Sequence, residues 1–333
     1  IGGGVTFPGM HVLLSNWAPK TERSVHSSIV YAGTSLGTVA SILATGYLTE
    51  HYSWETAFYW TGFVCLPWCF LWVWLVQDHP QSQKLISEKE RDFITNSIGN
   101  QLKNKESSHQ EIPLKSIFKS KPFYGILIAH ICNNWGWYMI LIELPLYVKQ
   151  VLKFRIQDNS ILTAIPYLTL WLFSMVLSKC LDSLKAKGVI STTIARKIAT
   201  FCCSVVPAFC LFGLCYIGCS RYIAIVLMFI AVTFSGGMFC GFLSNHIDIA
   251  PNYAGTLVSI TNTFATIPGI LVPVFVENLT HKDPTIGSWR IIFWITIILY
   301  IAEFIVFTIF GSGEEQSWNK KQQNSDEIET QSF

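Results

Sequence analysis

Long apolar runs with few charges constrain the fold of this chain more than any other feature. The clearest example is Ala129–Tyr147, which lies inside an apolar run that begins near Phe123. Runs of about 20 apolar residues are typical of membrane-spanning helices. Only 13% of the residues are charged and the mean hydropathy is +0.40, whereas soluble domains carry roughly 25% charged residues. The sequence therefore predicts an all-α, multi-pass integral membrane protein.

The apolar runs fall into two groups on either side of a polar stretch at 77–120. Nine runs can be counted, at 1–17, 24–49, 54–76, 123–147, 158–181, 198–218, 222–249, 253–277 and 289–311. Three runs precede the polar stretch and six follow it. If six spans form one bundle, about nine of twelve spans are present and the first bundle lacks its first three. This arrangement is typical of transporters built from two helical bundles with the solute site between them.

We therefore predict four regions. They are the rest of an N-terminal helical bundle (1–76, spans four to six), a cytoplasmic central loop (77–120), a C-terminal six-helix bundle (121–312) and a disordered cytoplasmic tail (313–333). The central loop contains a predicted short surface helix at Ser87–Ser97, which begins like a capping box.

The distribution of Lys and Arg predicts the orientation in the membrane. Eight of them lie between Lys84 and Lys121, and the loops on the same side of the membrane carry most of the others. Cytoplasmic loops are enriched in Lys and Arg, so the central loop and the C-terminus are expected in the cytoplasm. The sequon Asn278-Leu279-Thr280 then falls on the opposite side, where glycosylation is possible.

The run at 123–147 carries a stripe of polar and aromatic side chains. His130, Asn134 and Trp137 or Tyr138 share one helix face, because residues three or four apart are neighbours. Polar groups at membrane depth are costly unless they face other helices, water or a ligand. The stripe indicates either a solute pathway or an ordinary interhelical face, and spacing alone does not distinguish between these two interpretations. The candidate solute-binding residues here are Asn133, Asn134, Trp135 and Tyr138.

A second polar stripe lies in Gly255–Pro273. Ser259, Asn262, Thr263 and Thr266 recur at helical spacing, and Pro268-Gly269 interrupts the helix. Broken helices at mid-membrane often line solute sites, because their freed backbone groups need polar partners. Asn262 and Thr263 are therefore further candidate solute-binding residues. Helix packing is the alternative interpretation.

Two cytoplasmic turns pair acids with bases. Arg23 follows Glu22 in the turn Trp17–Ser24, and Asp182 precedes a basic loop in Ser178–Lys197. An acid at a helix end that faces a basic loop can latch two helices in one conformation and release them in another. The alternative is positive-inside topology with a surface ion pair. Arg23 and Asp182 are candidate gating or coupling residues.

Two histidines and one further acid complete the candidate gating set. His11 can titrate or bind an anion, although a hydrogen-bonded interhelical histidine is the alternative. His246 and Asp248 end the segment Thr233–Pro251 at its cytoplasmic side. Residues two apart do not share a helix face. We therefore expect these two to form an inner gate or a hydrogen-bonded helix end rather than a catalytic pair.

Two acids, Glu143 and Glu303, lie within apolar runs without a partner nearby in the sequence. Glu143 is close to the outer end of its run, so an interfacial, exposed position is expected. A proton-coupling role would need a carboxyl group removed from water.

Several function classes have no residues to support them. Phosphate loops, metal-ligand spacings and nucleophile motifs are absent from the sequence, so neither an enzyme nor a cofactor is predicted. A net charge of +2 gives no case for nucleic-acid binding. The ten cysteines are scattered through the apolar runs, where they are expected to act as small packing residues.

Several segments resemble a known family. GVTFPGMHVLLSNWAPKTERS, FYGILIAHICNNWGWYMILIELPLYV, ISTTIARK, SNHIDIAPNYAG, TNTFATIPGI and FGSGEEQSWN are similar to the anion/cation symporter branch (solute carrier family 17) of the major facilitator superfamily. That branch includes sialin, the vesicular glutamate transporters and sodium–phosphate cotransporter-like proteins. The resemblance covers Ile1 to Trp318 and looks closest to sialin and to insect inorganic phosphate cotransporters.

The resemblance implies twelve helices in two bundles and alternating access around a central anion site. It implies transport of organic anions or inorganic phosphate, coupled to protons or sodium, across a plasma, lysosomal or vesicular membrane. Vesicular glutamate transporters have an arginine where this chain has Asn133, and sialin has a glutamate near Gly3. These departures favour a phosphate-transporter-like or other organic-anion member. A transport-inactive receptor or scaffold derived from a transporter is the alternative.

Overall fold

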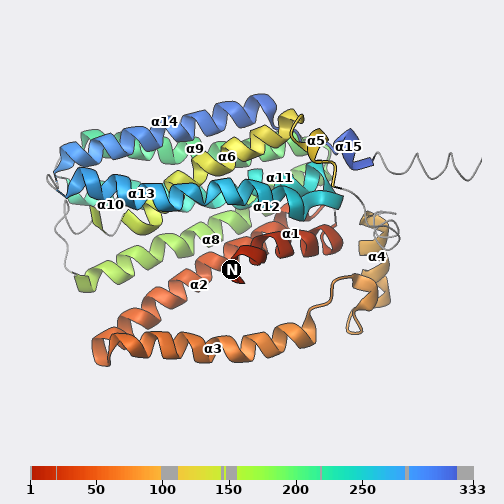
Figure 1. Ribbon diagram of the computed structural model, residues 1–333, viewed down its shortest axis with the longest axis horizontal. Helices are drawn as coiled ribbons and strands as arrows, with labels where there is room; N and C mark the ends of the chain where they lie inside the picture. The colour runs from red at the N-terminus through yellow and green to blue at the C-terminus, as the bar shows by residue number, and fades with distance from the viewer. Residues whose placement is uncertain are drawn as a thin grey trace, which may run out of the picture.

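The computed structural model describes residues 2–19, 21–98, 112–143, 146–147, 156–217, 220–281 and 285–320. Within these residues the chain is helical and contains no strand. Figure 1 shows long helices that run roughly alongside one another, with α3 set apart from the others. The predicted all-α fold is confirmed.

The helices fall on either side of the central loop. The amino-terminal helices are α1 (Thr6–Trp17), α2 (Arg23–His51) and α3 (Trp54–Leu75). The loop region carries α4 (Glu88–Ile98) and α5 (Leu114–Ile117), and α15 (Ser317–Lys320) lies near the C-terminus. The carboxy-terminal helices are α6 (Lys121–Tyr138), α8 (Ile156–Ala186), α9 (Thr192–Tyr216), α10 (Arg221–Ser235), α11 (Phe242–Ile249), α12 (Ala254–Ala265), α13 (Ile267–Thr280) and α14 (Ile286–Phe310).

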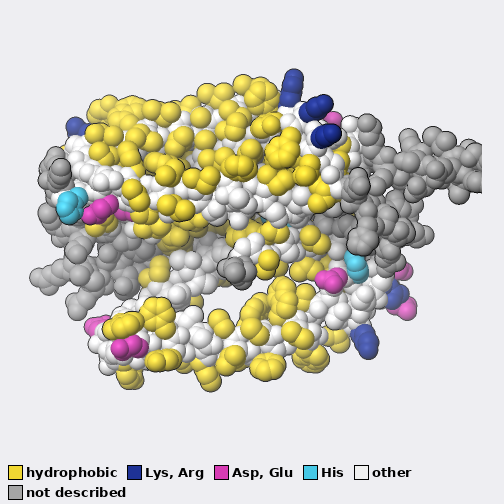
Figure 2. Space-filling model, viewed as in Figure 1, with side chains coloured by type: hydrophobic (Ala, Val, Ile, Leu, Met, Phe, Trp, Pro, Cys, Tyr) yellow, Lys and Arg dark blue, Asp and Glu magenta, His cyan; other side chains and the backbone are white. Residues whose placement is uncertain are grey.

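Eight helical segments in the described part of the chain are long and apolar enough to cross a membrane. Segments α10 with α11 and α12 with α13 each make one such span, whereas α1, with 12 residues, is too short to count. Hydrophobic side chains cover most of the visible surface between the helix ends, where the Lys and Arg side chains lie (Figure 2). The chain is therefore a multi-pass membrane protein, as the apolar runs predict.

The predicted interruption at Pro268 is confirmed, since α12 ends at Ala265 and α13 begins at Ile267. Proline has no backbone N–H and its ring displaces the preceding turn. The backbone N–H of Gly269 turns back to the carbonyl of Thr266 at 3.0 Å. The carbonyl of Ala265 instead accepts a hydrogen bond from the Asn134 side chain of α6 at 2.8 Å. A side chain of one helix thus replaces the backbone donor that the break removes.

A second break separates α10 from α11 at the 3₁₀ turn Gly236–Phe239. Two glycines make the close approach possible. A Cβ on Gly236 would lie 2.6 Å from the carbonyl oxygen of Leu170 in α8, and one on Gly237 would lie 2.6 Å from that of Ala199 in α9. Any larger residue would push α8 or α9 away from the turn.

The amino-terminal and carboxy-terminal helices meet along two main contacts. Helix α2 packs along α8, and α1 packs against α12. The core lies mainly among the carboxy-terminal helices, where α14 packs on both α6 and α9. Helix α3 packs mainly against α2 and exposes most of its apolar side chains.

Several sequence expectations can be compared directly with these elements. The surface helix predicted at Ser87–Ser97 is confirmed as α4. Glu143 does not lie exposed, because only 6% of it is accessible; it sits in the π-helical turn Met139–Glu143 that continues α6. Residues 99–111 of the central loop and 321–333 of the tail lie outside the described residues. The four predicted region boundaries stay predictions.

Candidate functional site

Buried polar side chains gather in three places: a histidine network, a charge cluster and a carboxyl–amide cluster. The histidine network lies where α1 and α2 meet the carboxy-terminal helices. His11 of α1, His130 of α6 and His246 of α11 are all buried. The ring centroids of His11 and His246 are 5.3 Å apart, and those of His130 and His246 are 6.0 Å apart.

Hydrogen bonds join the three imidazoles through shared partners. His11 Nε2 donates to the carbonyl of Leu243 at 3.1 Å, and His246 Nδ1 lies 3.0 Å from the same oxygen. The Thr261 hydroxyl lies 2.8 Å from His246 Nε2 and 3.2 Å from His130 Nδ1. The Tyr31 hydroxyl of α2 bonds to the other nitrogen of His11. Because a hydroxyl both donates and accepts, this chain of groups can hold more than one arrangement of protons.

The charge cluster joins α2 to three carboxy-terminal helices. Arg23 Nη1 lies 3.1 Å from Asp248 Oδ1, and Arg196 Nε of α9 lies 2.6 Å from Asp248 Oδ2. Arg196 also donates to the Ser24 hydroxyl and to the Cys240 carbonyl, each at 2.7 Å. Asp248 is 7% exposed and Arg196 is 1% exposed. Each carboxylate oxygen of Asp248 therefore meets its own guanidinium, which offsets the cost of burial.

Asp182 makes the second contact of this cluster. Its Oδ1 lies 2.5 Å from Lys185 Nζ, and its Oδ2 accepts from the backbone N–H of Val25 at 2.8 Å. The carboxylate of α8 thus binds the first turn of α2, where free N–H groups favour an anion. The Arg23–Asp248 ion pair joins the two helix groups, whereas the sequence suggested a pair within the turn. Arg23 bonds to Asp248 rather than to Glu22, which is exposed.

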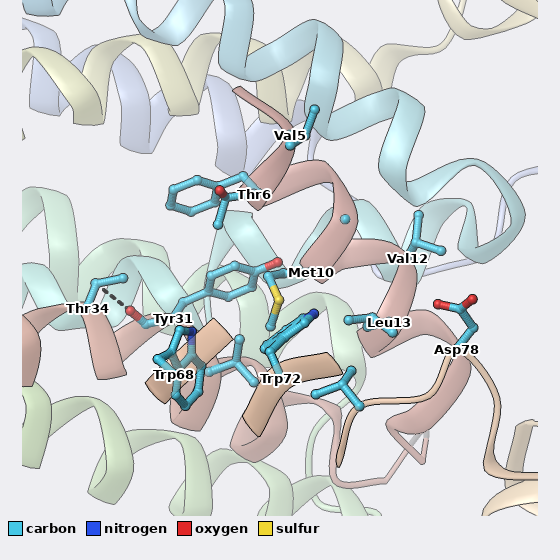
Figure 3. Close-up of a pocket in the computed structure, with 14 residues that line it drawn as sticks. Val5, Thr6, Met10, Val12, Leu13, Tyr31, Thr34, Trp68, Trp72 and Asp78 are labelled. Carbon is cyan, nitrogen blue, oxygen red and sulfur yellow. Dashed lines mark hydrogen bonds between the residues drawn. The ribbon is translucent and has the colours of Figure 1, made fainter. Parts of the chain in front are cut away.

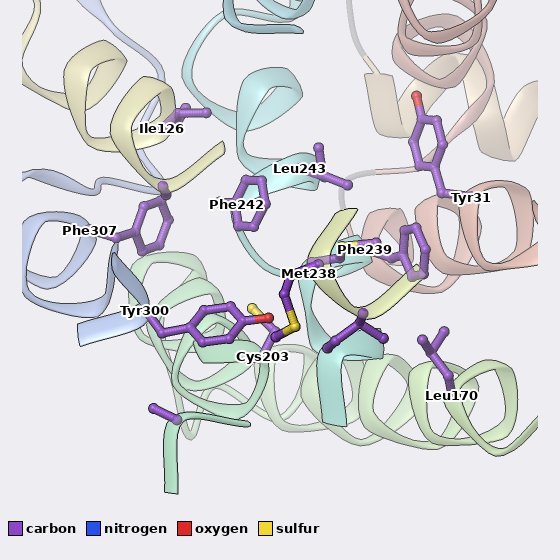
Figure 4. Close-up of a cluster of buried hydrophobic side chains, with 14 of the residues drawn as sticks. Tyr31, Ile126, Leu170, Cys203, Met238, Phe239, Phe242, Leu243, Tyr300 and Phe307 are labelled. Atoms are coloured by element: carbon purple, nitrogen blue, oxygen red, sulfur yellow. The ribbon is translucent and has the colours of Figure 1, made fainter. Parts of the chain in front are cut away.

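The carboxyl–amide cluster lies inside the carboxy-terminal helices. Asn133 Nδ2 of α6 is 3.0 Å from Glu303 Oε1 and 3.1 Å from Oε2. The Cys203 thiol of α9 is 3.6 Å from Oε1. Glu303 is fully buried, and Asn133 is 2% exposed. Tyr300 lies beside Cys203 in this part of the core (Figure 4).

The predicted solute-binding residues divide between two directions. Asn133 and Trp135 face α14, where the Trp135 indole N–H donates to the Thr296 hydroxyl at 3.2 Å. Asn134 and Tyr138 face the break between α12 and α13: Asn134 bonds to the Ala265 carbonyl, and the Tyr138 ring lies against Gly269. Asn133, which helical spacing leaves off the stripe of His130, Asn134 and Tyr138, therefore lies on a different face of α6.

The remaining two candidates lie on α12. Asn262 is half-buried, and Thr263 is exposed with its hydroxyl bonded to the Ser259 carbonyl at 2.8 Å. Asn262, Thr263 and Asn134 thus border the same helix break, whereas Asn133 and Trp135 do not. Binding of a solute by any of these residues stays a prediction.

A pocket of about 780 Å³ lies between α1, α2 and α3 (Figure 3). Apolar side chains line most of it, with Trp68 and Trp72 from α3 facing Tyr31 from α2. None of the six predicted solute-binding residues lines this pocket. Tyr31 connects it to the histidine network through His11.

Sequence reasoning missed several members of these clusters. Tyr31 was not singled out, and Thr261 lies on α12 off the stripe formed by Ser259, Asn262, Thr263 and Thr266. Cys203 belongs to a set that the sequence assigned to packing. Glu303 was visible as an acid in an apolar run, but its partner Asn133 lies 170 residues earlier.

Two groups of membrane-spanning helices that meet through buried polar side chains are an arrangement typical of two-bundle transporters. A model of the Major Facilitator Superfamily matches residues 1–273. The structure resembles that of the proton:xylose symporter XylE, with a TM-score of 0.68 and 14% identity, over 93% of this chain and 69% of that one. Human sialin is 42% identical over 318 residues, which are 96% of this chain and 63% of sialin.

A Drosophila ananassae protein named "Putative inorganic phosphate cotransporter" is 37% identical over 324 residues, which are 96% of this chain and 66% of that protein. The chain belongs to the major facilitator superfamily, and these two relatives are of the kind that the sequence motifs predicted. It spans less than two thirds of the length of these two relatives. The family expected from the sequence motifs is confirmed.

Proposed function

We propose that this chain is part of a secondary active transporter that moves small anions, either organic anions or inorganic phosphate, by alternating access. Protons or sodium ions supply the driving force, and the membrane is the plasma membrane or a lysosomal or vesicular one. The proposal includes no enzymatic step and no cofactor. Support comes from the family and from the relatives named sialin and "Putative inorganic phosphate cotransporter".

The single observation that carries the proposal is the buried polar contact between the two helix groups. Alternating access requires a closed contact at one side that can break and reform. The Arg23–Asp248 and Asp182–Val25 bonds join α2 to α11 and α8. These bonds are polar and few, so water can replace them when the groups separate.

In this mechanism the charge cluster is the cytoplasmic gate. Arg23, Asp182 and Asp248 hold it shut, and His11 with His246 forms a second contact deeper in the molecule. Asn134, Tyr138, Asn262 and Thr263 border the broken helix α12–α13, where the solute binds. Asn133 and Trp135 support this region from the side of α14.

Uptake by the intact protein in proteoliposomes tests the proposal. Inorganic phosphate, sialate and glutamate are offered with an imposed proton or sodium gradient. We expect accumulation of at least one anion that collapses when the gradient is dissipated. Binding of an anion without accumulation under any gradient would contradict transport and favour the receptor alternative.

The gate assignment has its own test in the same preparation. Replacement Arg23→Gln removes the ion pair between α2 and α11 but keeps Arg196 on Asp248. We expect faster labelling of Cys240, which is buried beside Arg196, by a water-soluble thiol reagent. Glu22→Gln, a change at the exposed neighbour, serves as the control. Equal labelling of all three proteins would overturn the gate assignment.

A further inference from the structure

Glu303 is a fully buried acid that the proposed gate does not use, and Glu143, which is 6% exposed, is the other buried acid of the described residues outside the gate. Glu303 is fully buried within α14, and its hydrogen-bond partners are the Asn133 amide and the Cys203 thiol. Among the described residues, no Lys, Arg or His forms an ion pair with it. An isolated carboxylate in such a place is very costly, so the neutral acid is the form that these surroundings favour.

The groups that face Glu303 from each neighbouring helix are neutral. Helix α6 contributes Asn133 and Cys132, α9 contributes Cys203, and Tyr300 lies one turn earlier on α14. The Tyr300 hydroxyl bonds to Ser235 rather than to the carboxyl. Cys240 approaches Cys203 from the segment before α11. No neighbour supplies a compensating positive charge in the described part of the chain.

Asn133 suits a carboxyl that gains and loses a proton. A primary amide both donates and accepts, so it can donate to a carboxylate or, after rotation, accept from a carboxylic acid. A lysine or arginine at this position would stabilise the charged form alone. Close packing holds the pair together, because a Cβ on Gly136 would lie 2.1 Å from the Tyr300 hydroxyl. Helices α6 and α14 can approach this closely only with glycine at that position.

The surroundings favour a proton over a metal cation. Hard cations such as sodium or magnesium bind several oxygen ligands at once. The Glu303 carboxyl is met by an amide N–H group and a thiol, with one carboxyl group supplying the oxygens. The described residues contain no cluster of three or more His, Cys, Asp or Glu that could hold a metal ion.

We propose that Glu303 is a proton-binding site of the carboxy-terminal helices. One carboxylate oxygen takes up one proton to give the neutral acid, which contacts Asn133 and Cys203. When water reaches the carboxyl group, release of that proton restores the carboxylate. Glu303 lies seven residues before the end of α14, about 10 Å along the helix, so a short opening at that end exposes it.

The location connects the site to both contacts between the helix groups. Asn133 is one turn from His130, which belongs to the histidine network. Cys203 is two turns from Arg196 on the same face of α9, and Arg196 bonds to Asp248. Protonation of Glu303 therefore acts on α9, which carries Arg196 of the charge cluster, and on α6, which carries His130 of the histidine network. This link to transport rests on the proposed function, whereas proton binding itself does not.

Infrared spectroscopy of the intact protein in lipid tests proton binding directly. A protonated carboxylic acid has a C=O stretching band that a carboxylate lacks. We expect such a band that shifts in D₂O and disappears in Glu303→Gln. The matched control is Glu277→Gln, at an exposed acid on α13, which keeps the band. If spectra of wild type and Glu303→Gln coincide at every pH, the proposal is overturned.

A second variant covers the case in which Glu303→Gln fails to fold. Asn133→Leu keeps the carboxyl but removes its amide partner, so the same band should move to higher frequency. No movement would show that the band belongs to another acid and would overturn the assignment. A band that responds to sodium at constant pH would also overturn it, because it would identify a cation site.

Transport measurements separate this proposal from the proposed function. With inorganic phosphate or sialate as the probe, Glu303→Gln should abolish the proton flux that accompanies uptake, while Glu277→Gln keeps it. If wild-type protein accumulates none of the three anions offered in the uptake assay, the transporter proposal fails and the infrared result alone decides proton binding. Unchanged proton flux in Glu303→Gln would refute the link between this site and transport.

Discussion

Asp248 and Glu303 are two buried acids of the same helical assembly with opposite surroundings. Asp248 is 7% exposed and faces two guanidinium groups, from Arg23 and Arg196. Glu303 is fully buried and faces an amide and a thiol. The same functional group is thus compensated as an anion in one place and left without a counter-charge in the other.

The difference shows that burial alone does not define what an acid does in a membrane protein. An acid with paired cations holds helices together, because separation exposes both charges at once. An acid without cations gains or loses a proton when its surroundings change. Asp248 joins α11 to α2 and α9, whereas Glu303 bonds within the carboxy-terminal helices. Substitution of each carboxyl by its amide separates the two roles.

The largest effect is expected for Asp248→Asn. This change leaves Arg23 and Arg196 buried without their counter-charge, and breaking a buried pair in this way costs about 3–5 kcal/mol. We expect a large fall in the thermal unfolding midpoint of the purified protein in detergent. The control is Asp92→Asn on α4, where the side chain is 70% exposed and 3.9 Å from Arg91; exposed pairs contribute at most about 1 kcal/mol. Equal midpoints for both variants would contradict the buried cluster.

A smaller loss is expected for Asn133→Leu, which removes the amide that bonds to both oxygens of Glu303. A buried polar group left without a partner costs about 1–3 kcal/mol. The double variant Asn133→Leu with Glu303→Leu removes both polar partners and should recover much of that loss. Thermal unfolding of the single and double variants measures the coupling. A double variant that is less stable than Asn133→Leu would show that Glu303 has another strong partner.

A similar or smaller loss is expected for Arg23→Gln, because Asp248 keeps Arg196 at 2.6 Å. One hydrogen bond to a charged group contributes about 1.5–3 kcal/mol. The matched change Glu22→Gln should have no measurable effect on the unfolding midpoint, since Glu22 is exposed. A stability loss in Glu22→Gln equal to that in Arg23→Gln would instead support the Glu22–Arg23 pair that the sequence suggested.

The sequence predicted the helices well, because the length and composition of an apolar run depend on local residues only. It also predicted the break at Pro268, since proline acts on its own backbone. Partners across helices were harder to predict. Helical spacing placed His130 and Asn134 on one face, but it could not show that the adjacent Asn133 turns towards α14. No residue near Glu303 in the sequence identifies Asn133 as its partner. In the same way, no residue near Arg23 identifies Asp248.

The smallest effect is expected for Glu303→Gln. Glutamine has nearly the shape of a protonated glutamic acid, and its amide group can bond to Asn133 and Cys203. If the carboxyl is neutral, the change should alter the unfolding free energy by less than about 1 kcal/mol. Glu303→Lys places a charge in the same apolar surroundings and should cost several kcal/mol. Both are measured by thermal unfolding beside Asp248→Asn. A loss in Glu303→Gln as large as that in Asp248→Asn would mean that Glu303 is an anion with a cationic partner, and the contrast between the two acids would disappear.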